Sequence, residues 1–244
     1  MSPLKNLVLL LAGIAAVAAS LSTTYAQDDL CQNGAKDNCE GRFMIAQSAL
    51  AAADHWTFKA DVLAPDNKTR LGYAELLVHL QGATNNGLTA RNIAAYTNYS
   101  MPLQHYKDGR IDPVKDTGWR EWCGMFALDI IRGGLEAANS PRLSAIGHWN
   151  IMAGTGISGV KGFRNITSAP ARAAQPGDVC ALNKHAHHAL IVAVHPTHLE
   201  TVEGNAECNG SVSTVCKMTR KHPTNPSACT NCSPQCDAIY TAFP

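Results

Sequence analysis

The chain lacks a charge imbalance, and it lacks long apolar runs beyond its first residues. Its 244 residues include 20 Lys and Arg against 19 Asp and Glu, a formal charge of +1. A protein that grips nucleic acid or anionic lipid through bulk charge needs a larger basic excess. No stretch after the N-terminal segment is apolar enough to cross a bilayer, and there are no internal repeats. We therefore predict no nucleic-acid or membrane partner for the mature chain.

Residues 1–26 have the composition of a signal peptide. Lys5 precedes an uncharged apolar core from Leu7 to Ala19, and Thr24-Tyr25-Ala26 fits a cleavage site before Gln27. The core is too short to span a bilayer, and a retained N-terminal anchor is the alternative interpretation. Cleavage would remove Lys5 and leave the mature chain without net charge. We expect a secreted or periplasmic protein.

The cysteine count is odd, which is informative in an exported chain. Nine cysteines leave at least one thiol without an intramolecular partner in an oxidising compartment. Cys123 is the cysteine that stands at the start of a predicted helix, so we expect the other eight to form disulfides without it. These eight are Cys31, Cys39, Cys180, Cys208, Cys216, Cys229, Cys232 and Cys236. Short spacing favours Cys31–Cys39 and Cys208–Cys216, but the sequence does not fix the connectivity.

Helical patterns come before strand-like patterns along the chain. Apolar periodicity predicts helices over residues 42–62, 71–80, 89–99 and 124–133, the last ending at Gly133-Gly134. Loop composition marks residues 82–87 and 100–121. Short β-rich runs follow at residues 179–182, 187–194 and 199–203. This order indicates an α+β fold with an antiparallel sheet rather than alternating β-α units.

Four segments are expected from these boundaries. They are a signal peptide (1–26), an N-terminal helical extension (27–69), a catalytic domain (70–222) and a Cys-rich tail (223–244). Because Pro, Asn, Ser, Thr and three cysteines dominate the last segment, we expect disulfides to pin it.

The residues needed by a cysteine hydrolase occur in a workable order. Such a site needs a thiol, a histidine that takes and returns its proton, and a polar group that orients the histidine. Cys123 lies where the helix dipole favours a thiolate. The strand beginning at Ala186 supplies His187 or His188, and the next strand supplies Glu203 and Asn205, which strict alternation would place on one face.

Strand alternation favours His187 over His188 as the base. His187 shares a face with Ala189 and Ala193, which leave room for a helix, whereas Leu190 and Val192 on the face of His188 would not. The sequence leaves the choice between the two histidines open.

Structural roles and a metal site are the alternatives. A cysteine before an amphipathic helix is often a buried small residue, and Glu-Gly-Asn is ordinary turn chemistry. His185, His187, His188, His195 and His198 make a dense cluster, and Cys229, Cys232 and Cys236 have ligand-like spacing. Export favours disulfides among these cysteines, and no carboxylate is obvious in the His cluster. We therefore predict no metal and no cofactor.

Several motifs together resemble the CHAP amidase family of papain-like peptidoglycan hydrolases. They are Trp122-Cys123 before Gly-Met-Phe-Ala, Pro176-Gly177-Asp178 before a strand, His-x-Ala-Leu-Ile-Val, and Glu203-Gly-Asn205. The likeness covers roughly residues 70–220, with a weaker lead-in at Asn85-Asn86-Gly87 and Tyr96. Two departures are His188, where the family usually has Val or Ile, and Cys180, where an apolar residue is usual.

The resemblance implies a papain-like fold with the catalytic Cys at a helix N-terminus packed on the sheet. It implies Cys123 as nucleophile, His187 as general base, Glu203 as the group that orients the histidine, and Asn205 in a supporting role. Trp122 and Asn86 would contact substrate. The expected activity is cleavage of an amide in peptidoglycan, between muramic acid and L-alanine or within the peptide stem or cross-bridge, by a monomer. A general secreted cysteine peptidase or transpeptidase, and a non-catalytic disulfide-stabilised binding protein, are the rival hypotheses.

Overall fold

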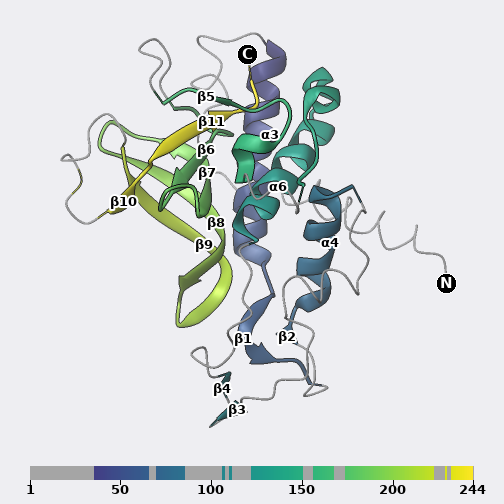
Figure 1. Cartoon of the computed structure of the whole chain (residues 1–244), viewed down its shortest axis with the longest axis vertical. Coiled ribbons are helices and arrows are strands. Elements are labelled where there is room, and N and C mark those ends of the chain that lie inside the picture. Colours follow the sequence, from purple (N-terminus) through teal and green to yellow (C-terminus); the bar gives the residue numbers. More distant parts are fainter. Residues whose placement is uncertain are drawn as a thin grey trace, which may run out of the picture.

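The computed structural model has an α+β architecture in which two helices pack on a seven-stranded sheet and a third packs on one of these helices (Figure 1). The structure describes residues 36–65, 70–85, 106–107, 110–111, 122–150, 156–167, 174–222, 229 and 232–243. The helices are α3 (Lys36–His55), α4 (Tyr73–Ala83) and α6 (Cys123–Ala137), with 3-10 turns η1 (Pro141–Ala145) and η2 (Gly156–Gly159). Within these ranges, none of the helices is long and apolar enough to cross a membrane.

Seven strands form the main sheet, in the order β10-β9-β8-β7-β6-β11-β5. Their bounds are β5 Arg164–Asn165, β6 Val179–Leu182, β7 His187–Val194, β8 His198–Cys208, β9 Ser211–Lys221, β10 Ser233–Gln235 and β11 Ala238–Thr241. Neighbouring strands are antiparallel except β9 and β10. The short strands β1 (Lys59–Leu63) and β2 (Arg70–Leu71) pair separately, as do β3 (Tyr106–Lys107) and β4 (Arg110–Ile111).

Helix α6 is the central element of the core. It contacts the helices α3 and α4 and the strands β7 and β8, and its surface is accordingly apolar nearly all round. Its buried side chains, including Phe126 and Leu128, join one apolar cluster with Ile45 of α3 and Leu190 of β7. This packing fixes the start of α6, and with it Cys123, against the sheet.

The predicted end of this helix is wrong by several residues. The helix runs through Gly133 and Gly134 to Ala137, and Asn139 adopts the left-handed φ of 48° that ends it. Gly134 serves close packing instead, because a Cβ there would lie 2.6 Å from Ile45 Cα. Gly134, one of the two glycines that predicted a helix end, therefore allows the close contact between α6 and α3.

The other predicted helices agree with the observed bounds to different degrees. The helix predicted over residues 42–62 is observed as α3, Lys36–His55, and its predicted end is the strand β1, Lys59–Leu63. The helix predicted over 71–80 is observed as Tyr73–Ala83. The helix predicted over 89–99 lies outside the described residues. Within the loop predicted over 100–121, the described parts are the paired strands β3 and β4.

The strand predictions identified β6 and β7 with their observed bounds, but they shortened β8 and missed β9. β8 and β9 form a long hairpin whose turn is Asn209-Gly210, both with positive φ. Asn-Gly is the strongest short-range hairpin signal in a sequence. Asn209-Gly210 is such a signal.

The end of the predicted tail belongs to the sheet. β11 pairs with β6 on one side and β5 on the other. The Cys180–Cys236 disulfide ties the segment before β11 to β6. Arg42 of α3 adds a buried link: its guanidinium donates to Asp178 Oδ1 at 2.8 Å and to Thr241 Oγ1 at 3.1 Å. Pro176-Gly177-Asp178 is therefore the meeting point of α3, β6 and β11.

Disulfides account for the described cysteines other than Cys123. The pairs are Cys180–Cys236, Cys208–Cys216 and Cys229–Cys232, and the prediction of Cys208–Cys216 is confirmed. Cys39 is disulfide-bonded as well. Cys31, its predicted partner, lies outside the described residues. Several disulfides in one chain are typical of an oxidising, extracellular environment.

Candidate functional site

Cys123 is the first residue of α6 and is a free cysteine, buried in the structure. The residue before it, Trp122, provides no side-chain cap, and the first turn carries no acidic residue. The first N–H groups of a helix have no intrahelical partner. Among the described residues no side chain caps this helix start, so its backbone N–H groups could serve a negatively charged oxygen, as an oxyanion site requires.

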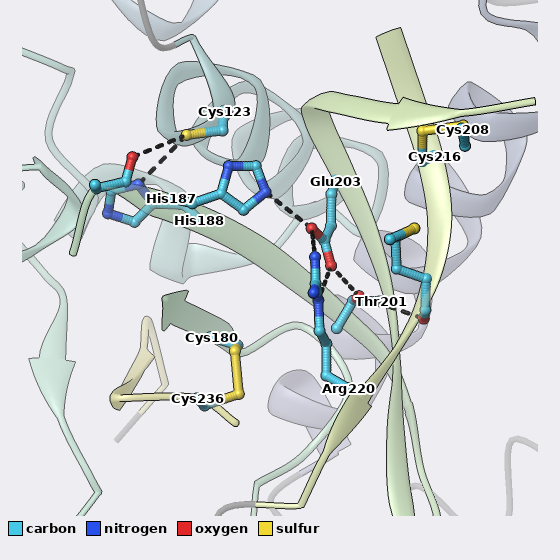
Figure 2. A network of polar contacts seen from close by, with 12 residues as sticks. Cys123, Cys180, His187, His188, Thr201, Glu203, Cys208, Cys216, Arg220 and Cys236 are labelled. Carbon is cyan, nitrogen blue, oxygen red and sulfur yellow. Dashed lines mark hydrogen bonds and ion pairs between the residues drawn. A yellow bond between two sulfur atoms is a disulfide. The ribbon is translucent and has the colours of Figure 1, made fainter. Parts of the chain in front are cut away.

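His187 and Glu203 form a hydrogen-bonded pair beside this sulfur. His187 Nε2 lies 2.8 Å from Glu203 Oε2. Figure 2 shows the imidazole of His187 between Cys123 and Glu203, with its other nitrogen toward the cysteine. Burial, the largest influence, opposes charge on His187, but hydrogen bonds to Cys123 and Glu203 and their negative charges raise its pKa to about 10. His187 therefore lies between the sulfur of Cys123 and the buried carboxylate of Glu203, and both favour its charged form.

Glu203 is fully buried and is held by two residues that the sequence did not single out for this purpose. Thr201 donates its hydroxyl to Oε1 at 2.6 Å, and Arg220 donates from Nε to Oε1 at 2.6 Å and from Nη2 to Oε2. Burial acts to raise the pKa of Glu203, but hydrogen bonds from His187, Arg220 and Thr201 and the charge of Arg220 lower it to about 2. Glu203 is thus a fixed, ionised partner for His187.

Arg220 was missed because its strand was missed. It lies on β9, which pairs with β8 and so places Arg220 beside the strand that carries Glu203. The signal that would have found it is the Asn209-Gly210 turn, which predicts β9 and its register.

His188 also contacts the nucleophile. Its Nδ1 lies 3.7 Å from Cys123 Sγ, and its Nε2 accepts a hydrogen bond from the Ile157 backbone N–H at 3.3 Å. Its side chain is almost completely buried. Burial, and then the charges of His187 and His185, lower its pKa to about 4. The structure therefore places both candidate histidines at Cys123, in different electrostatic states.

The packing argument that favoured His187 rests on a wrong premise. Leu190 and Val192 share the apolar cluster that contains α6, whereas Ala189 and Ile191 belong to a second cluster. Helix α6 therefore packs on the face of β7 that alternation assigns to His188. His187 reaches Glu203 from the other face of β7, because Leu190 pairs with Val202 and Glu203 therefore shares a face with Ala189 and His187.

An unusual turn sets the two histidines at the strand start. Asn183, Lys184 and His185 all have positive φ, between 51° and 71°. Such conformations cost energy in residues other than glycine and persist where the surroundings fix them. The Lys184 backbone N–H donates to Asp237 Oδ2 at 2.6 Å, which anchors the turn to the segment before β11.

Asn205 lies at an irregularity in β8. The register with β9 shifts between Glu203 and Ala206, and Asn205 has a positive φ of 56°. Strict alternation is broken there, so it does not place Asn205 on the face of Glu203. Gly204 between them packs tightly, because a Cβ there would lie 2.6 Å from Trp122. The supporting role of Asn205 stays a prediction.

The two predicted substrate contacts do not gain support. Trp122 is fully buried, stacks on Trp56 with ring centroids 5.7 Å apart, and packs edge-on against Phe58 and Phe126. Its side chain is a core element, which corrects the predicted substrate contact. Asn86 lies outside the described residues.

The structure changes the view of possible metal ligands. Cys229, Cys232 and Cys236 are all in disulfides. His195 and His198 do have a carboxylate nearby, which the sequence prediction overlooked: Glu200 Oε1 lies 3.0 Å from His195 Nε2. The three ligand atoms lie within 4.8 Å of one another, so this half-buried group at the β7–β8 turn could hold a metal ion.

No protein-family model, curated protein or solved structure matched the chain. The argument for function therefore rests on the geometry around Cys123.

Proposed function

We propose that the chain is a cysteine hydrolase that cleaves an amide bond, with Cys123 as nucleophile, His187 as general acid and base, and Glu203 as the group that orients His187. The observation that carries this proposal is the arrangement of a free cysteine at a helix start beside a histidine whose far nitrogen is 2.8 Å from a buried carboxylate. A helix start, a proton carrier and an orienting anion are what an activated thiol requires.

The residues support a two-stage reaction. The Cys123 thiolate attacks the amide carbonyl, and the N–H groups at the start of α6 stabilise the resulting oxyanion. Protonated His187 gives its proton to the leaving amine, which leaves a thioester on Cys123. Neutral His187 then takes a proton from water, and the hydroxide attacks the thioester carbonyl. The acid departs and the thiolate returns, paired again with protonated His187.

The substrate class rests on the sequence resemblance. The order of Cys123, Pro176-Gly177-Asp178, His187 and Glu203-Gly-Asn205 resembles CHAP amidases, so the proposed substrate is peptidoglycan and the proposed fold is papain-like. The scissile bond would join muramic acid to L-alanine or lie in the peptide stem or cross-bridge. The signal-peptide composition and the disulfides support a secreted or periplasmic location.

The test compares the unmodified protein with Cys123→Ala on purified peptidoglycan. We expect soluble muropeptides from the unmodified protein only, because the variant has no nucleophile. Gly133→Ala is the matched control, since a Cβ at Gly133 meets nothing within 4 Å. Mass spectrometry of the products identifies the bond. Equal turnover by Cys123→Ala and the unmodified protein would show that Cys123 is not the nucleophile.

Two rival functions have separate signatures. A general peptidase would cleave unrelated peptides as fast as peptidoglycan, and a transpeptidase would yield products joined to an added amine. A binding protein would have an inert thiol at Cys123, which iodoacetamide would not alkylate in the native protein. Because Cys123 is only 2% exposed, the same experiment also tests whether a reactant reaches the sulfur. Rapid, saturable alkylation favours the enzyme.

A further inference from the structure

His188 is a buried histidine at the nucleophile that the reaction above does not use. Its two ring nitrogens have different partners, Ile157 N–H at Nε2 and Cys123 Sγ at Nδ1. A backbone N–H can only donate, so Nε2 must accept and carry no proton. In a neutral imidazole the proton is then on Nδ1, the nitrogen that faces the sulfur.

The surroundings of His188 hold the ring in this orientation. Gly124 and Gly156 flank it so closely that an added Cβ would lie 3.1 Å from Nδ1 and 3.0 Å from Nε2, respectively. Trp149 packs edge-on against the ring, with centroids 5.9 Å apart and an interplanar angle of 89°. A Cβ at Gly124 would clash first with Trp149, at 2.2 Å, and a Cβ at Gly156 would crowd the imidazole directly, so little space is left around the ring.

We propose that His188 remains neutral, carries its proton on Nδ1 and donates it in a hydrogen bond to the Cys123 thiolate. This inference rests on the proposed function for the meaning of the thiolate, but not for the tautomer. The sulfur then has two different donors from adjacent residues: a charged one, His187, which moves protons, and a neutral one, His188, which does not. This hydrogen bond would account for a histidine at position 188, where the resembling family usually has Val or Ile.

A buried thiolate needs such a donor. Cys123 is almost inaccessible to solvent, so water does little to stabilise the negative sulfur. The Ala186 carbonyl oxygen lies 3.9 Å from Sγ and, as an acceptor, repels the charged form. Among the described residues, the charges that act on His188 are those of His187 and His185, and both lower its pKa and so favour a neutral ring. A hydrogen bond from neutral His188 offsets these costs without adding a second buried cation.

The tautomer is measured directly by ¹⁵N NMR of the histidine side chains in the unmodified protein at neutral pH. We expect His188 to show a protonated Nδ1 and an unprotonated Nε2, and His187 to show both nitrogens protonated. A His188 ring with its proton on Nε2, or with two protons, would overturn the proposal. This measurement needs no variant, so a folding defect does not affect it.

Two variants test the effect on the sulfur. His188→Phe keeps a ring but removes the donor, whereas His188→Asn places an amide N–H near the position of Nδ1. We expect His188→Phe to slow alkylation of Cys123 by iodoacetamide at mildly acidic pH by about tenfold, and His188→Asn to restore most of the rate, because a hydrogen bond to a charged group is worth that much. Equal rates in unmodified protein and folded His188→Phe would contradict the proposed hydrogen bond, as would failure of rescue in folded His188→Asn.

The outcomes separate this inference from the proposed function. Tautomer and alkylation are independent of substrate. If Nδ1 is protonated and alkylation responds as expected, but peptidoglycan is untouched, the hydrogen bond stands and the hydrolase assignment fails. If peptidoglycan is cleaved while His188 has its proton on Nε2, the hydrolase assignment stands and this inference fails.

Discussion

Replacing Glu203 with Gln tests whether the carboxylate controls the charge on His187. The two side chains are 2.8 Å apart, and the pKa of His187 is raised to about 10 partly by Glu203. A neighbouring opposite charge shifts a pKa by about 1–3 units. We therefore expect Glu203→Gln to lower the pKa of His187 to about 7–9, because the neutral amide keeps the shape but removes the charge.

The lowered pKa of His187 should change the pH dependence of both activity and stability. In the proposed reaction protonated His187 is the acid that releases the amine, so the alkaline limb of kcat/KM should move down by about 1–3 units as well. His187 has a raised folded pKa, so its contribution to stability is complete below 6.5 and is lost as pH rises through about 10. Glu203 has a folded pKa of about 2, so its contribution is present above 4.5 and is lost as pH falls toward 2. The variant should lack that acid dependence.

Arg220 complicates the single replacement. It pairs with Glu203 in a buried site, so Glu203→Gln leaves an uncompensated cation and should cost about 3–5 kcal/mol of unfolding free energy. The double variant Glu203→Gln/Arg220→Met removes both charges, and most of that stability should return. The pKa of His187 should stay low in both variants, because neither has the carboxylate.

The assay is an NMR titration of the histidine ring protons, with urea unfolding from acidic to alkaline pH. The decisive sample is the folded double variant. A His187 pKa still near 10 in that sample would refute the reasoning, since it would mean that the Cys123 thiolate alone keeps the imidazole charged.

Two further predictions concern the framework that positions the site. Gly134→Ala should lower the unfolding free energy by about 1–3 kcal/mol, because its Cβ would lie 2.6 Å from Ile45 Cα. Gly133→Ala should be neutral or stabilising by up to about 1 kcal/mol, because its Cβ meets no other atom within 4 Å. Equal urea midpoints for the two variants would contradict this contrast. Replacing Cys180 and Cys236 together with Ala should cost about 2–5 kcal/mol in urea unfolding, and an unchanged midpoint would show that the disulfide is not needed to hold the last strand.

The sequence was informative where a local pattern and the tertiary environment agree. β7 is apolar in continuous sequence and begins at His187, so its bounds were predictable. The odd cysteine was predictable from the count alone, and the free state of Cys123 among the described cysteines agrees with it. The α+β class followed from helices preceding strands.

Other features depend on contacts that no local pattern contains. Gly134 resembles a stop signal until Ile45 is placed against it. The choice of helix-facing surface on β7 failed because Leu190 and Val192, judged too large, are the residues that α6 packs on. Arg220 became visible only through the register of β8 with β9, and the second contact of His188, Ile157 N–H, comes from a distant turn.

The placement of β11 between β5 and β6 has a consequence for the order of assembly. Of the described strands it is the last to be synthesised, yet β5, made more than 70 residues earlier, has no other neighbour in the sheet. The hydrogen bond from Arg42 to Thr241 and the disulfide from Cys180 to Cys236 likewise form only after this last segment has been synthesised. The chain should therefore stay open along this edge until residue 241 has been synthesised, and the free thiol of Cys123 should coexist with unpaired Cys180 until Cys236 is available.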